Sequence, residues 1–255
     1  MTTIRMDPHG HLYDAYSVRA WCSAALTNLQ AGDDSLAVVV VVDRQGQNSL
    51  DRLRREVPLF GSWKDLPGSP AGVAEVDSRK LLVIQGVQYV SSERIEVLGL
   101  GVRRVLSDGL AAGEYIESIL KGGGVPCLPW SPGKWLGSRG RLVKTFLDAH
   151  SPATLAVGDI AIRSVLGPPS SLLRYARQRG YRVFHGTDPL PSPRDERLVG
   201  TFGVEISGIS FSDECGGVDT ILEAMRSPEV PFRQRGRRNS GCRAVGRFVG
   251  QFLGL

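Results

Sequence analysis

The chain lacks the features of a membrane, secreted or disulfide-stabilised protein. It has no apolar run of about 18 residues, which a membrane-spanning helix needs, and its N-terminus has no basic-then-apolar signal segment. Its four cysteines, Cys22, Cys127, Cys215 and Cys242, are far apart and form no C-x-x-C pair. This spacing argues against a disulfide scaffold and against a thiolate zinc knuckle. We therefore expect a cytoplasmic protein with no membrane partner.

Net positive charge is absent from most of the chain and is concentrated at its C-terminal end. Residues 226–255 contain seven arginines and only Glu229 as an acidic residue, whereas the other 225 residues carry 24 basic and 25 acidic side chains. This asymmetry predicts a main domain over residues 1–225 and a basic extension over residues 226–255, packed on the main domain or flanking it. The arginines could contact a polyanion or an acidic partner, or form a solvated arm. We expect this extension to be separable from the functional site.

Apolar strand-like segments alternate with helical patterns along the chain. Residues 37–42 are nearly all β-branched, as in a strand buried on both faces. The predicted strands are residues 2–6, 37–42, 81–84, 95–100, 125–128, 154–157 and 182–184, and the predicted helices are 50–57, 114–121, 141–149 and 170–179. This alternation indicates an α/β fold with a mostly parallel sheet, which we interpret as a closed or distorted β/α barrel of about seven or eight strands.

Two of the four histidines lie together at the end of the first predicted strand, as His9 and His11. Side chains two residues apart in an extended segment point the same way, so both imidazoles could face one metal ion. The alternative is a pair of surface histidines in a turn. The nearby Asp7 either shapes that turn or orients one of the histidines.

Polar and ionisable residues follow several of the other predicted strands. Since the carboxyl ends of the strands of a β/α barrel share one rim, these residues are expected to meet there. The candidates are Glu93, Lys134, Asp159, Arg163, His185 and Asp188.

For most of these candidates a structural role and a functional role both stay open. Glu93 is either a surface partner of a nearby arginine or a ligand or general base. Lys134 is either a solvated loop residue or a cation presented to an anionic substrate. Arg163 either holds a phosphate or pairs with Asp159, four residues before it. His185 is either a metal ligand or an acid–base group.

Several short segments resemble the PHP family, the polymerase-and-histidinol-phosphatase group of metal-dependent phosphoesterases. Residues 7–14 (DPHGHLYD) resemble its opening motif, residues 86–90 with 95–100 resemble its middle motif, and residues 186–188 (GTD) resemble its last. The order of these elements is also similar to that of the wider amidohydrolase superfamily.

The resemblance implies a distorted, seven-stranded barrel that binds one or two divalent ions, Zn, Mn or Fe. It implies a metal-activated water that attacks a phosphoester or another anionic small-molecule substrate. In this hypothesis His9, His11, His185 and Asp188 hold the metal. Glu93 or Asp159 completes the site or accepts a proton, and Lys134 and Arg163 stabilise negative charge.

The sequence departs from the PHP pattern at three positions. Gln88 stands where the family usually has glutamate, Glu96 where it has histidine, and Leu190 where it has a histidine after the last aspartate. Leucine cannot bind a metal and glutamine binds it weakly, so a trinuclear site is excluded. These departures motivate the alternative hypothesis of a non-catalytic barrel that serves as a binding or scaffold protein.

Overall fold

The computed structural model describes residues 2–32, 34–102, 106–131, 133–163, 170–209 and 214–238. One sheet of eleven strands runs through them. The strands are β1 (Thr2–Gly10), β2 (Ser35–Asp43), β3 (Ser62–Asp65), β4 (Ala71–Val76), β5 (Arg79–Val90), β6 (Glu96–Leu100), β7 (Val125–Pro129), β8 (Ala156–Ile160), β9 (Val183–Gly186), β10 (Phe202–Ile209) and β11 (Phe232–Gly236). The helices are α1 (Val18–Asn28), α2 (Ser49–Glu56), α3 (Ala112–Lys121), α4 (Gly137–Ala149), α5 (Ser171–Gln178) and α6 (Glu214–Arg226), with 3₁₀ turns at Val57–Leu59 and Pro193–Leu198.

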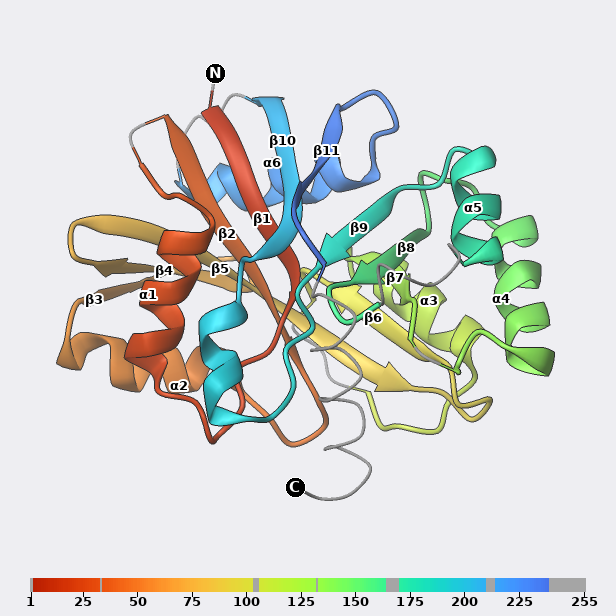
Figure 1. Cartoon of the computed structure of the whole chain (residues 1–255), viewed down its shortest axis with the longest axis horizontal. Coiled ribbons are helices and arrows are strands. Elements are labelled where there is room, and N and C mark those ends of the chain that lie inside the picture. Colours follow the sequence, from red (N-terminus) through yellow and green to blue (C-terminus); the bar gives the residue numbers. More distant parts are fainter. Residues whose placement is uncertain are drawn as a thin grey trace.

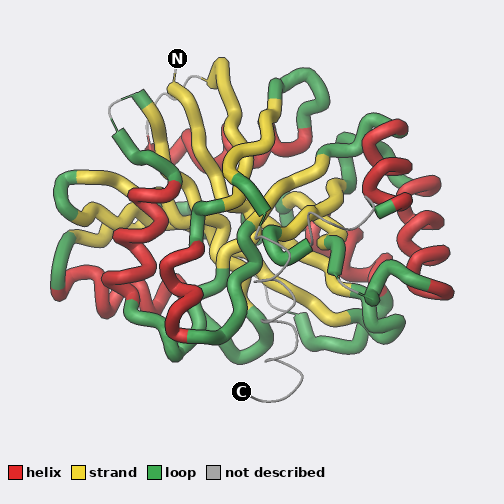
Figure 2. The backbone as a smooth tube through the Cα atoms, viewed as in Figure 1, coloured by secondary structure: helices red, strands yellow, loops and turns green. Residues whose placement is uncertain are grey.

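The sheet curls into a nearly closed barrel, as the sequence predicts. Its order is β11-β10-β1-β2-β5-β6-β7-β8-β9, with the β3–β4 hairpin attached to β5. Figure 1 shows α1 and α2 against one side of the sheet and α4 and α5 at the opposite end, and Figure 2 shows the strands as the central layer between them. The gap between β9 and β1 is bridged by a hydrogen bond from the Asp188 backbone N–H to the His9 carbonyl, at 2.8 Å.

The direction of the strands brings one set of strand ends together. β1, β2 and β5 are parallel, β7, β8 and β9 are parallel, and β6 is antiparallel to both β5 and β7. The carboxyl ends of β1, β2, β5, β7, β8 and β9 therefore lie at one edge of the barrel, together with the amino end of β6. This edge is where the polar residues selected from the sequence are found.

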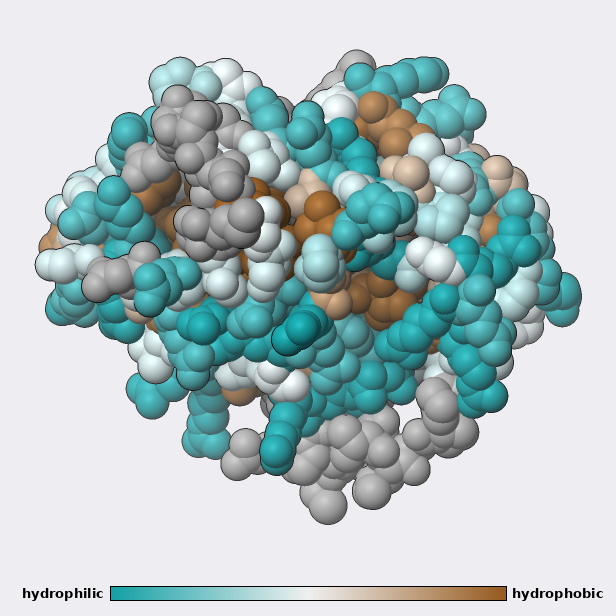
Figure 3. All heavy atoms as spheres, turned by 90° about the horizontal axis from the view of Figure 1, so that it is seen from above, coloured by the Kyte–Doolittle hydropathy of each residue, from teal (hydrophilic) through white to brown (hydrophobic). Residues whose placement is uncertain are grey.

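The core lies on both faces of the sheet, which explains the continuous apolar runs of its strands. One face of β2, including Val38 and Val40, packs inside the barrel with residues of α6, and the other face, including Val39, packs against α1. A third cluster forms where α3, α4 and α5 cover β5 to β8. Viewed from above, the surface is mostly hydrophilic, with separate hydrophobic patches (Figure 3). Within the described residues, no helix is long and apolar enough to cross a membrane.

The predicted strands and helices all correspond to elements of the structure, with shifted ends. The sequence interpretation missed α1, the β3–β4 hairpin, β10, α6 and β11. Residues 232–236 of the predicted extension form β11, which pairs with β10 over five register positions and so belongs to the sheet. Residues 239–255, which include the apolar end of the extension, lie outside the described residues.

Candidate metal centre

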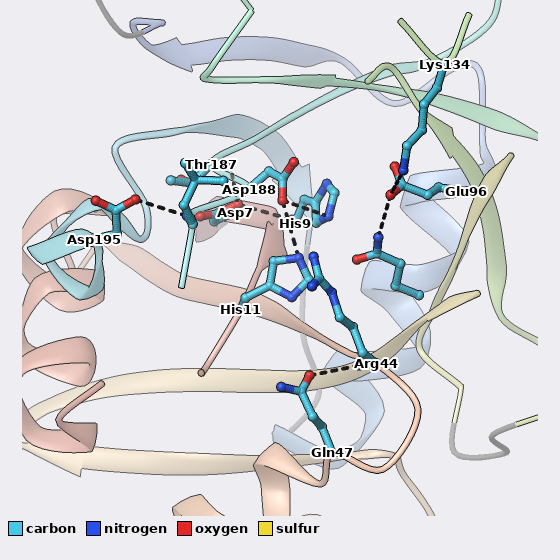
Figure 4. Close-up of polar contacts among 12 residues, drawn as sticks. Asp7, His9, His11, Arg44, Gln47, Glu96, Lys134, Thr187, Asp188 and Asp195 are labelled. Atoms are coloured by element: carbon cyan, nitrogen blue, oxygen red, sulfur yellow. Dashed lines mark hydrogen bonds and ion pairs between the residues drawn. The ribbon is translucent and has the colours of Figure 1, made fainter. Parts of the chain in front are cut away.

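His9, His11 and Asp188 meet at the carboxyl edge of the barrel (Figure 4). His9 lies near the end of β1, His11 directly follows it, and Asp188 follows β9. Asp188 Oδ1 lies 3.6 Å from His9 Nε2 and 3.3 Å from His11 Nε2. One ligand atom from each residue lies within 4.8 Å of the other two, so the three could coordinate a single ion.

The burial and the hydrogen bonding of these side chains suit a metal ion. His9 and His11 are buried, and Nε2 of both has no hydrogen-bond partner. Burial lowers the pKa of His9 to about 4, so its imidazole is neutral at pH 7, the form that binds metal. Burial raises the pKa of Asp188, but the adjacent His9 and His11 outweigh it and bring the value to about 2. Two imidazoles and one carboxylate are a donor set for Zn, Mn or Fe, and the Nε2 atoms without a hydrogen bond fit such an ion.

Asp7 holds the backbone that carries this triad. Its buried carboxylate accepts hydrogen bonds from the backbone N–H groups of His9 at 3.1 Å, Thr187 at 3.0 Å and Gly200 at 2.9 Å. Asp7 therefore connects the end of β1 to the end of β9. Of the two roles that the sequence left open, the contacts favour positioning, through the backbone of His9 and not through its ring.

Gly186 allows the two strand ends to approach each other. A Cβ atom at this position would lie 2.5 Å from the Cβ of His9, closer than side chains tolerate. Asp188, two residues later, has a φ of 44°, in the left-handed region. The β9 end thus passes close to His9 and then turns its carboxylate towards both histidines.

Arg44, which the sequence analysis did not select, lies beside the triad. It directly follows β2, and its side chain extends to His11 in Figure 4. Its guanidinium lies 5.6 Å from the ring centre of Tyr13, which in turn stacks on His11 at 5.1 Å. Its position immediately after a buried strand is the same signal that selected the other candidates.

Lys134 is engaged with Glu96 and is not a freely solvated lysine. The Lys134 ammonium forms an ion pair with Glu96 Oε1, and Gln88 Nε2 donates to the same oxygen at 3.0 Å. Figure 4 shows Lys134 and Glu96 across the barrel edge from His9. Glu96 is thus neutralised by an ammonium group within the protein.

Asp159, Arg163 and His185 form a second cluster. The fully buried Asp159 carboxylate forms two hydrogen bonds with Arg163, at 2.6 and 2.7 Å, and one with Arg238 at 2.5 Å. Burial acts to raise the pKa of Asp159, but these two arginines lower it overall. Nδ1 of His185 lies 3.6 Å from Asp159, so His185 belongs to this cluster and not to the metal triad.

Glu93 lies between β5 and β6, and its side chain reaches the first turn of α3. Its carboxylate accepts a hydrogen bond from the backbone N–H of Ala112, the first residue of that helix, at 3.1 Å.

The structure places the other candidates selected from the sequence in three groups. His9, His11 and Asp188 form the triad, and Lys134 pairs with Glu96. Asp159, Arg163 and His185 form the second cluster. Arg238 joins the second cluster from a segment that the sequence presented only as part of a basic extension.

No protein-family model matches the sequence. No curated protein matches it either. Among solved structures, PsfC from Pseudomonas syringae PB-5123 is similar over 99% of this chain and 100% of its own, with a TM-score of 0.62 and 14% identity. Endonuclease Q from Pyrococcus furiosus, a lesion-specific endonuclease, is similar over 87% of this chain, with a TM-score of 0.50 and 11% identity.

A two-domain protein from Bacteroides vulgatus with a predicted PHP-like metal-dependent phosphoesterase is similar over 92% of this chain, with a TM-score of 0.48 and 11% identity. The chain spans 56% of the length of Endonuclease Q and 65% of that of the Bacteroides protein. At these identities the likeness is one of fold.

Proposed function

We propose that the chain is a metal-dependent hydrolase of the PHP type that acts on an anionic substrate, most simply a phosphoester. The observation that carries this proposal is the triad of His9, His11 and Asp188, in which the buried Nε2 atoms of both histidines face the carboxylate and form no hydrogen bond. Burying a polar nitrogen without a hydrogen bond costs free energy, so an arrangement with two such nitrogens beside a carboxylate favours a ligand that all three can bind.

The residues of the triad supply the metal-binding groups, and the surrounding cations supply the attraction for substrate. A divalent ion, when bound, provides positive charge and a water molecule of lowered pKa. Arg44 adds positive charge beside the triad, which suits an anionic ester and the charge that develops on it, whereas the charge of Lys134 is balanced by Glu96. The abasic DNA duplex bound by a structurally similar endonuclease is likewise a phosphodiester.

Two carboxylates selected from the sequence are assigned other roles in this proposal. Asp159 accepts hydrogen bonds from two guanidinium groups and has a lowered pKa, which makes it a weak base. Glu93 binds the backbone at the start of α3. We therefore assign Asp159 to positioning of the arginines and Glu93 to stabilisation of the helix.

The first prediction concerns metal binding. The purified protein should bind about one equivalent of Zn²⁺, Mn²⁺ or Fe²⁺, and the His9→Ala/His11→Ala variant should lose most of it. Elemental analysis after dialysis measures the content. His150→Ala is the matched control, because this histidine lies at the end of α4 and outside the triad. Equal metal content in the wild type and the double variant would refute the proposal.

A non-catalytic barrel is the second candidate, and the Lys134–Glu96 pair favours it. Three positions where the PHP pattern has metal ligands are unsuited to a metal. Glu96 is ion-paired with the Lys134 ammonium group, Gln88 is neutral, and Leu190 cannot bind a metal. In that case the protein would bind a small molecule or partner without hydrolysing it. A protein that binds metal but cleaves no phosphomonoester or phosphodiester in a metal-dependent screen would support this candidate.

A further inference from the structure

We propose that Arg163 and Arg238, with Arg177 beside them, form a binding site for an anionic group of the substrate, a phosphate or a carboxylate, next to the metal centre. This inference rests on the proposed function for its link to catalysis, and it assigns the substrate a second anionic group. It also gives the C-terminal segment a direct part in the site.

The charge of this cluster is unbalanced. Within the described part of the chain, Asp159 is the one carboxylate that forms an ion pair with Arg163 or Arg238. Arg163 is only 6% exposed and Asp159 fully buried. The charge of Arg177, on the exposed side of α5, also acts on this cluster. Because buried positive charge in excess of its counterions is unfavourable, the cluster attracts an additional anion.

The cluster also contains hydrogen-bonding atoms without partners. Nε of Arg238 is buried with no hydrogen bond. Nδ1 of His185 is also buried without a hydrogen bond, and the His185 side chain is only 8% exposed. A guanidinium carries five N–H donors in a planar arrangement that matches the oxygens of phosphate and carboxylate. An oxyanion between the arginines would supply the acceptor that Nε of Arg238 lacks.

The position of the cluster connects it to the metal centre. Asp159 and His185 are opposite each other in the register of β8 and β9. The next residue, Gly186, packs against His9. One substrate molecule could therefore place its scissile ester at the triad and a second anionic group between the arginines.

An alternative role for Arg238 is structural, as a side chain that fastens the segment after β11 to β8. Both roles use the ion pair with Asp159, so a loss of stability in a variant cannot separate them. Anion binding separates them, because only the proposed site requires it.

The experiment measures binding of inorganic phosphate, and in a second arm acetate, to the full chain by isothermal titration calorimetry. We expect saturable binding of at least one probe, weakened about tenfold or more in Arg238→Gln. The matched control is Arg237→Gln, which removes an adjacent exposed arginine and should bind as the wild type does. Tighter binding of phosphate or of acetate identifies the preferred group.

Two further measurements keep the outcome decisive. Metal content is determined on each sample. Phosphate binding is then repeated after treatment with a chelator, and it should persist because the proposed anion site does not depend on the triad.

If Arg238→Gln does not fold, Arg238→Lys replaces it. Lysine keeps the charge but not the paired donors, so this variant should also bind the probe more weakly. Equal binding by wild type and Arg238 variants, or no binding of either probe, would overturn the proposal. Loss of metal content with intact anion binding would instead count against the proposed function alone.

Discussion

The buried imidazole of His185 contributes to the pH dependence of the stability of the fold. Burial lowers its pKa to about 4 from an ordinary value of 6.5, although Asp159 opposes this shift. Between these two values the unfolded chain binds a proton that the folded chain does not. Stability is therefore fully present above pH 6.5 and decreases as the pH falls towards 4.

We predict that His185→Gln removes this part of the pH dependence. Between pH 7 and pH 5 the wild type should lose about 2 kcal/mol more unfolding free energy than the variant, at about 1.4 kcal/mol for each unit of pKa. Urea unfolding at the two pH values measures the difference. Equal losses in both proteins would mean that His185 is not held in its neutral form.

Asp7 carries a second prediction at this scale. In Asp7→Asn, one carboxylate oxygen that accepts backbone N–H groups becomes an NH₂ group that cannot accept. We expect a loss of about 1–3 kcal/mol of stability and a weaker affinity for metal, because the backbone of His9 and the β9 end is no longer held. Thermal melting and metal titration measure these changes. Asp219→Asn, at an exposed position of α6, should change neither.

The sequence reveals some of these residues and conceals others for a physical reason. His9 and His11 are visible because the alternation of a strand is a local rule. Arg238 is not, since its contact with Asp159 joins residues 79 positions apart. No local pattern distinguishes this arginine from its neighbour Arg237.

Among the elements, the strands with continuous apolar runs and four of the helices were predictable, whereas the β3–β4 hairpin, β10, β11, α1 and α6 were not. The valines of β2 identify a strand because they are β-branched and buried on both faces. β3 has mostly exposed residues, and β10 contains two glycines, so neither has a clear period. The helix α1 did have a signal in Ser17, whose side chain accepts from Ala20 at its first turn.

The helix α3 provides the prediction at this scale. Ala111 cannot cap the helix with its own side chain, and Glu93 supplies an acceptor for the N–H of Ala112 instead. Glu93→Ala should therefore destabilise the protein by about 1 kcal/mol, the usual cost of a lost cap. Metal content should not change. If the variant instead keeps its stability and loses metal-dependent hydrolysis, Glu93 acts in the chemistry, as its position after a strand first suggested.

For the whole molecule, the alternation of elements was sufficient to predict a β/α barrel, whereas charge alone suggested the division between residues 1–225 and the basic extension. The arginines of residues 226–255 look like an appendage because charge is easily seen in a sequence and strand pairing is not. In the structure β11 extends the sheet beside β10, Phe232 packs 5.8 Å from the ring of Phe184, and Arg238 reaches the Asp159 cluster. We therefore expect that removal of the whole extension would disturb the sheet and the Asp159 cluster.

Two truncations test this conclusion. A chain that ends after residue 231 loses β11 and leaves the edge of β10 unpaired, so its melting temperature should fall steeply and its metal content should fall with it. Phe232 alone would contribute about 1.5–3 kcal/mol if it were fully buried, and it is partly buried here. A chain that ends after Arg238 keeps β11 and the Asp159 cluster, so it should retain metal and phosphate binding. Heparin retention of this second chain should also stay close to that of the full chain, because five of the seven arginines remain. If the chain ending after residue 231 melts as the full chain does, β11 is dispensable and the charge-based division of the molecule was correct.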